Sequence, residues 1–151
     1  MIHAMLCTLM IGNVLPEPEP CKYCLTVQVL EWHGSGVEWE ELEPPEDAWV
    51  IAEMTVPLWR NKWRSHWITI APEPGADTTG QLGVYVRADS VSTDWLRLEM
   101  EVTYWRTSDQ NLLTDGKHLH EAELRVGDRH WLGNSTRVPN RGFVARLHRA
   151  K

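Results

Sequence analysis

The strongest constraint on the fold is a strict two-residue alternation between positions 96 and 104. The apolar members are Leu96, Leu98, Met100, Val102 and Tyr104, and the polar members are Arg97, Glu99, Glu101 and Thr103. Successive side chains of a β-strand point to opposite faces, so this pattern predicts a strand with one apolar and one polar face. Such strands are typical of antiparallel sheets that bury one face and leave the other in water.

Shorter segments with the same period recur along the chain, and turn-forming residues such as Pro44-Pro45 and Asp115-Gly116 separate them. The other strands that we expect cover residues 25–30, 49–56, 66–70, 82–88, 118–126 and 143–147. The chain has 151 residues, a length that suits one domain. The sequence therefore predicts an all-β protein, a single antiparallel β-sandwich or jelly-roll-like domain of about seven to eight strands.

The first twenty residues differ from the rest of the chain. Residues Ala4–Ile11 are an apolar run, and alternating prolines from Pro16 to Pro20 favour an extended polyproline II spacer. The apolar run is either a secretory signal or a first strand, and the sequence leaves both open. We divide the chain into residues 1–20, an apolar segment with a Pro-Glu spacer, and residues 21–151, the β-sandwich domain.

The three cysteines are Cys7, Cys21 and Cys24, and the last two form a CxxC pair. In an oxidising compartment the pair can close a local disulfide, and in a reducing one it can contribute to a zinc site. It opens an expected strand and not a helix, which disfavours redox catalysis. Ordinary thiols or a local disulfide are the favoured interpretation. An exported or extracellular protein is favoured over a cytoplasmic one.

The charge is unevenly distributed along the chain, and the formal net charge is −6. Residues 1–58 carry ten acidic groups and one lysine, whereas residues 59–151 carry a net charge of +3. An acidic chain lacks the clustered basic groups that general nucleic-acid binding requires. This uneven distribution of charge suits head-to-tail association between copies of the chain. It can also simply reflect acidic loops followed by salt-bridged strands. No apolar run reaches the roughly 18 residues that a transmembrane helix needs.

Nine tryptophans are unusual for this length, and three of them recur every four residues as Trp59, Trp63 and Trp67. On a strand, these three would share one face, and Arg60 and Arg64 would share the other. Flat indole rings in a row can stack on sugars, and a basic amphipathic stretch can touch an anionic surface. The alternating rings and guanidinium groups can also form a cation–π ladder, or the rings can fill the core between two sheets. The candidate ligand-binding residues are these five.

A second cluster is histidine-rich, with His118 and His120 on one expected strand face and Glu123 and His148 as further candidate ligands. The HxH pair resembles the metal motif of the cupins, in which an HxH is followed by a glutamate and a later histidine. The resemblance implies a transition metal in a small β-barrel enzyme. The spacing to Glu123 is shorter than in that motif, and His148 is displaced. Phosphate-binding loops and nucleophile elbows are absent from the sequence.

We therefore expect a non-enzymatic binding or structural module, exported or part of a larger protein assembly, that uses a Trp-rich β-sandwich surface. The expected partner is another protein or a second copy of the chain. One alternative is a carbohydrate-binding module that stacks sugars on the three tryptophans. The other is a small cupin-like metal-dependent enzyme, the only alternative that implies a cofactor.

Overall fold

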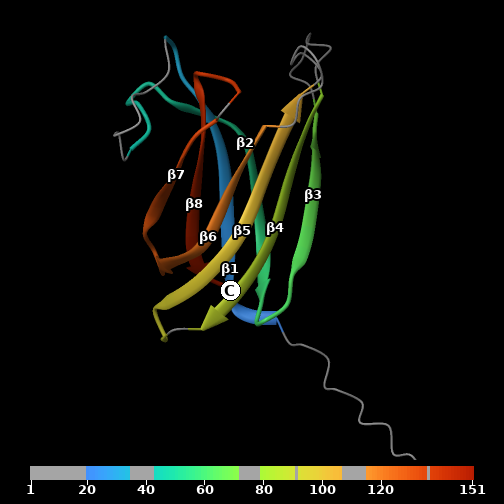
Figure 1. Ribbon diagram of the computed structural model, residues 1–151, viewed down its shortest axis with the longest axis vertical. Helices are drawn as coiled ribbons and strands as arrows, with labels where there is room; N and C mark the ends of the chain where they lie inside the picture. The colour runs from blue at the N-terminus through green and yellow to red at the C-terminus, as the bar shows by residue number, and fades with distance from the viewer. Residues whose placement is uncertain (1–19, 35–42, 72–78, 91, 107–114, 136) are drawn as a thin grey trace, which may run out of the picture.

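The computed structural model describes residues 20–34, 43–71, 79–90, 92–106, 115–135 and 137–151. Two antiparallel four-stranded sheets face each other as a β-sandwich (Figure 1), which confirms the expected fold class. The strands of the described residues are β1 (Pro20–Glu31), β2 (Trp49–Trp59), β3 (Arg64–Ile70), β4 (Gly80–Ser90), β5 (Trp95–Arg106), β6 (Asp115–Arg125), β7 (Arg129–Asn134) and β8 (Arg141–Arg149).

The two sheets differ in how the chain builds them. Sheet A has the strand order β2-β1-β8-β7, and sheet B has the order β3-β4-β5-β6. Sheet B is a simple meander of consecutive strands, whereas sheet A joins the two ends of the described chain through the β1–β8 pair, in which Leu25 lies opposite Leu147. The chain changes sheet twice, between β2 and β3 and between β6 and β7.

Alternation decides which side chains fill the space between the sheets. On β5 the apolar set predicted from positions 96 to 104 is buried, and the residues between its members point outward. Val27 and Phe143 from sheet A meet Val84 and Met100 from sheet B in one apolar cluster. Burying an aliphatic or aromatic side chain of this size contributes roughly 1.5–3 kcal/mol. The core cluster of the described residues contains no tryptophan.

The β2–β3 corner interrupts the Trp-rich stretch. Strand β2 ends at Trp59, Arg60 forms an isolated bridge with Ala88, and Asn61 adopts a φ of 54°. The Asn61 amide donates a hydrogen bond of 2.9 Å to the Ala88 carbonyl, which fastens the corner to sheet B. Asparagine tolerates this left-handed conformation better than most residues. The expectation that Trp59, Trp63 and Trp67 lie on one continuous strand face is therefore wrong.

Strand β7 was not expected from the sequence. Its burial pattern is irregular, because Leu132 is its only buried residue and a register shift lies between Trp131 and Gly133. Pairing with the central strand β8 is what extends this segment. A two-residue period cannot reveal a strand that has one buried position.

Residues 1–19 lie outside the described residues, and with them lie the possible signal, most of the Pro-Glu spacer and Cys7. The division of the chain at residue 20 stays a prediction. Among the described residues, no helix is long and apolar enough to cross a membrane.

Candidate functional site

The outer face of sheet B carries an exposed group of aromatic side chains, which we call the aromatic face and define as Trp63, Trp67 and Tyr85. Trp67 and Tyr85 are 58% and 42% exposed. Alternation places them there, because their neighbours Ile68 and Val84 point toward the core. Strands β3 and β4, which carry this face, lie at one edge of sheet B (Figure 1).

Trp67 is held in place despite its exposure. Its indole N–H donates a hydrogen bond of 2.8 Å to Ser65 Oγ. Its ring lies across the backbone of Gly83, its partner on β4, where a Cβ atom would come within 2.5 Å of the ring carbons. A side chain at position 83 would push the ring away, so glycine is what allows this close approach. One face of the indole rests on the sheet and the other is open to solvent.

Trp63 and Tyr85 form a parallel stack beside Trp67. Their ring centroids are 4.4 Å apart and their planes are inclined by 13°. The Arg87 guanidinium lies 5.3 Å from the Trp63 ring centroid and forms a 3.0 Å ion pair with Glu99. Aromatic stacking and a cation–π contact thus brace these rings against the sheet.

Charged groups of both signs share the outer face of sheet B with the aromatic side chains. Arg97 on β5 forms a 3.2 Å ion pair with Glu123 on β6, and both side chains are 47% exposed. Glu101 lies directly opposite Tyr85 in the β4–β5 register and is exposed. Exposed pairs of this kind contribute little to stability, about 0–1 kcal/mol. They do place groups of both signs on this outer face.

The structure separates the five residues predicted from the Trp-rich stretch. Trp63 and Trp67 both lie on the aromatic face, Trp63 stacked on Tyr85 and Trp67 over Gly83. Trp59 is half-buried at the edge between the sheets, with the Arg64 guanidinium 4.3 Å from its ring centroid, so one predicted cation–π pair forms there. Arg60 is exposed in the corner. These rings do not fill the core between the sheets, as one interpretation had them.

His66 lies beside this edge contact, and its side chain points to the inner side of β3. Burial, together with the nearby Arg64 guanidinium, lowers the pKa of His66 below its ordinary value. Both influences disfavour the charged imidazole. The surroundings of His66 therefore favour a neutral imidazole at neutral pH.

Tyr85 and Gly83 belong to the site but were not expected from the sequence. Tyr85 sits at a polar position of the expected strand 82–88 and carries no motif. Gly83 was the available signal, because a glycine inside a strand marks a close approach of another group. Only the β3–β4 pairing shows that this group is Trp67.

The histidine-rich cluster is spread over both sheets. Glu123 lies on the outer face of sheet B, and His148 lies on the outer face of sheet A, where its Nε2 is 2.9 Å from Thr26 Oγ1. The structure therefore does not bring these two together. His118 pairs with Glu101 in the register of β5 and β6, and the side chains of His118 and His120 lie outside the described residues. Among the described residues, no three histidine, cysteine or acidic groups form a metal-binding cluster.

Of the CxxC pair, Cys24 has a free, half-buried thiol and lies opposite His148 on β8. The side chain of Cys21 lies outside the described residues. The choice between a disulfide and a metal site for this pair stays a prediction.

Comparison with known proteins adds no relative. No protein-family model matches the chain, and neither a curated protein nor a solved structure matches it. Functional inference therefore rests on the geometry of the chain itself.

Proposed function

We propose that the protein is a non-enzymatic binding module that builds an assembly by packing the aromatic face of sheet B against a second copy of the chain. The observation that carries this proposal is Trp67, a large side chain that is 58% exposed and yet fixed by Ser65 and Gly83. A ring already held in one orientation loses little conformational freedom on binding.

The composition of the face supports a protein interface. Tryptophan, tyrosine and arginine are the residues that dominate binding energy at protein interfaces, and Trp67, Tyr85 and Arg87 share the same outer face here. Contiguous exposed aromatic surface is also uncommon on monomeric proteins. Covering the open side of Trp67 would remove apolar surface from water, which favours association.

The charges support a second copy as the partner. A two-fold interface pairs one surface with itself, so any charges it carries are best arranged as groups of both signs. The same outer face of sheet B carries Arg87 and Arg97, and Glu99, Glu101 and Glu123. Rotation about a two-fold axis can set the basic groups of one copy near the acidic groups of the other. Like charges then need not meet.

Sedimentation velocity of the full chain across a concentration series tests this proposal. We expect the wild type to sediment as a dimer or larger species at about 10 µM, a concentration at which a micromolar interface is largely formed. Trp67→Ala should sediment as a monomer there, because it removes the central anchor. Trp49→Ala is the matched control, since Trp49 is 41% exposed but lies on β2 of the other sheet.

Two results would contradict the proposal. A wild type that stays monomeric over the whole series has no self-association to explain. A Trp49→Ala variant that dissociates as fully as Trp67→Ala would show that loss of any exposed tryptophan suffices.

A carbohydrate-binding module is the second candidate, and the open face of Trp67 favours it. A flat ring resting on a sheet can stack on the apolar side of a sugar, and Gln81 and Thr69 lie beside it on the same outer face to meet hydroxyl groups. Affinity electrophoresis in gels containing a panel of polysaccharides tests this candidate. At least one gel should retard the wild type more than Trp67→Ala, and equal migration in every gel would remove the candidate.

A further inference from the structure

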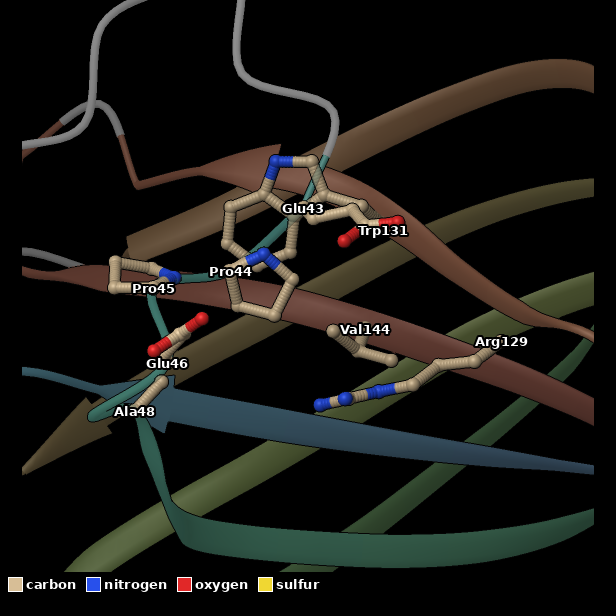
Figure 2. A pocket seen from close by; sticks show the side chains of 8 residues that line it. All are labelled: Glu43, Pro44, Pro45, Glu46, Ala48, Arg129, Trp131 and Val144. Carbon is tan, nitrogen blue, oxygen red and sulfur yellow. The ribbon is translucent and has the colours of Figure 1, made fainter.

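A second candidate site lies on the outer face of sheet A, away from the aromatic face. A hollow of about 390 Å³ opens between β7, β8 and the segment that precedes β2 (Figure 2). Trp131 and Arg129 come from β7, Val144 from β8, and Glu43, Pro44 and Glu46 from the preceding segment. Its volume falls at the lower end of the range for small-molecule sites, roughly 300–1,000 Å³.

The apolar part of the hollow is firmly built. Trp131 lies opposite Val144 in the β7–β8 register, and Val144 is only 1% exposed although it points away from the core. The Trp131 ring presses on Gly142, where a Cβ atom would come within 2.1 Å of it. Its other neighbour is Trp32, whose ring centroid is 6.3 Å away. These contacts hold the Trp131 indole ring in one position before any ligand binds.

Three charged side chains surround this apolar part. Glu43 and Glu46 come from the segment that precedes β2, and Arg129 enters from β7 (Figure 2). Within the described part of the chain, no hydrogen bond or ion pair engages the side chain of any of the three. The hollow thus offers a ligand two negatively charged carboxylates, which accept hydrogen bonds, and one positively charged guanidinium group, which donates them.

We propose that this hollow binds a small zwitterion, a free α-amino acid. Its ammonium group would be held by the Glu46 carboxylate, its carboxylate by the Arg129 guanidinium, and its side chain against Trp131 and Val144, with Glu43 adding negative charge on the other side of Pro44. An ion of one sign would leave at least one of these protein charges facing a like charge. A zwitterion satisfies both signs, and charge-assisted hydrogen bonds to carboxylates and guanidinium groups are among the stronger ones.

Thermal shift and saturation-transfer NMR of the full chain with each of the twenty L-amino acids, at about 10 mM, test this proposal. For the amino acid with the largest effect, two matched probes follow. Its amide lacks the carboxylate, and its N-acetyl derivative lacks the ammonium group. We expect both probes to bind at least about tenfold more weakly, because each leaves one side of the hollow unpaired.

Variants then locate the site. Arg129→Gln and Glu46→Gln should each weaken binding about tenfold, and all the altered side chains are exposed, so the fold should be retained. Arg146→Gln is the matched control: Arg146 lies directly opposite Arg129 on β8 and is exposed, but it does not line the hollow. It should bind like the wild type.

Three results would overturn the proposal. One is that no amino acid gives a signal. Another is that the amide binds as well as the parent amino acid, which would leave Arg129 without a role. The third is that Arg146→Gln weakens binding as much as Arg129→Gln, which would point to overall charge and not to this hollow. Because the hollow lies on sheet A, these results are independent of the self-association test on sheet B.

Discussion

At the scale of single residues, two glycines each make room for a tryptophan ring, one exposed and one half-buried. Gly83 lies under Trp67 and Gly142 lies under Trp131, and at both positions a Cβ atom would overlap the ring. The two sites differ in their freedom to relax. Trp67 is 58% exposed and can lift into solvent, whereas Trp131 is half-buried near Trp32. The same substitution should therefore have different effects at the two positions.

We predict that Gly142→Ala destabilises the fold by about 2 kcal/mol, a typical cost of overpacking. Gly83→Ala should change stability by less than about 1 kcal/mol, but it should weaken self-association by displacing Trp67. Urea unfolding measures the first quantity and sedimentation the second. Equal losses of stability in the two variants, or unchanged association in Gly83→Ala, would contradict this account.

His66 makes stability depend on pH. Its pKa is lowered in the folded state by burial and by Arg64, so the unfolded chain binds the proton more readily. This contribution to stability is therefore complete above the ordinary histidine pKa of about 6.5 and is lost as the pH falls from there through the lowered folded pKa.

We expect the wild type to lose stability between pH 7 and pH 5 by urea unfolding, and His66→Gln to lose less over the same interval. His33→Gln is the control, because His33 is exposed. If His66→Gln follows the wild-type curve, His66 does not contribute to this pH dependence.

At the scale of secondary structure elements, a buried ion cluster ties three strands together at one end of the sandwich. Glu31 at the end of β1 contacts Arg106 of β5, and the Arg141 guanidinium of β8 lies 3.7 Å from the same carboxylate. Arg141 is 1% exposed, and its guanidinium also lies 4.8 Å from the Tyr104 ring centroid. Removing the Glu31 charge would leave a buried guanidinium without that compensation.

Glu31→Gln should therefore lower the free energy of unfolding by about 3 kcal/mol, as expected when one partner of a buried ion pair is removed. Glu123→Gln provides the comparison, because its pair with Arg97 is exposed and should contribute less than about 1 kcal/mol. Denaturant unfolding of both variants measures the difference. Similar losses would show that the cluster is no stronger than a surface pair.

The elements that could be predicted from the sequence are those with two-residue periodicity. Strand β5 is the clearest example, because its buried and exposed positions follow the alternation from Leu96 to Tyr104. A break between the expected strands 49–56 and 66–70 was predicted, but the place of the β2–β3 corner was not, since Asn61 turns the chain without a glycine or proline at that point. Strand β7 is held by pairing with β8, a long-range contact that leaves no local signal.

At the scale of the whole molecule, the tryptophans account for both candidate sites. The cluster between the sheets is filled by aliphatic side chains with Tyr104 and Phe143. Among the tryptophans of the described residues, Trp32 is fully buried at 1% exposure, whereas Trp49, Trp67 and Trp95 are exposed. Composition predicted a Trp-rich surface on a sandwich. It could not predict which rings would be exposed, because that depends on sheet order and on the glycines opposite them.

The most direct test of the central claim is hydroxyl-radical footprinting of the full chain at low and high protein concentration, with oxidation of individual tryptophans read by mass spectrometry. If the aromatic face packs against a second copy, oxidation of Trp67 should fall as the concentration rises, while oxidation of Trp49 on the other sheet stays constant. Unchanged oxidation of Trp67 under conditions where the protein is shown to associate would contradict the claim and would place the interface elsewhere.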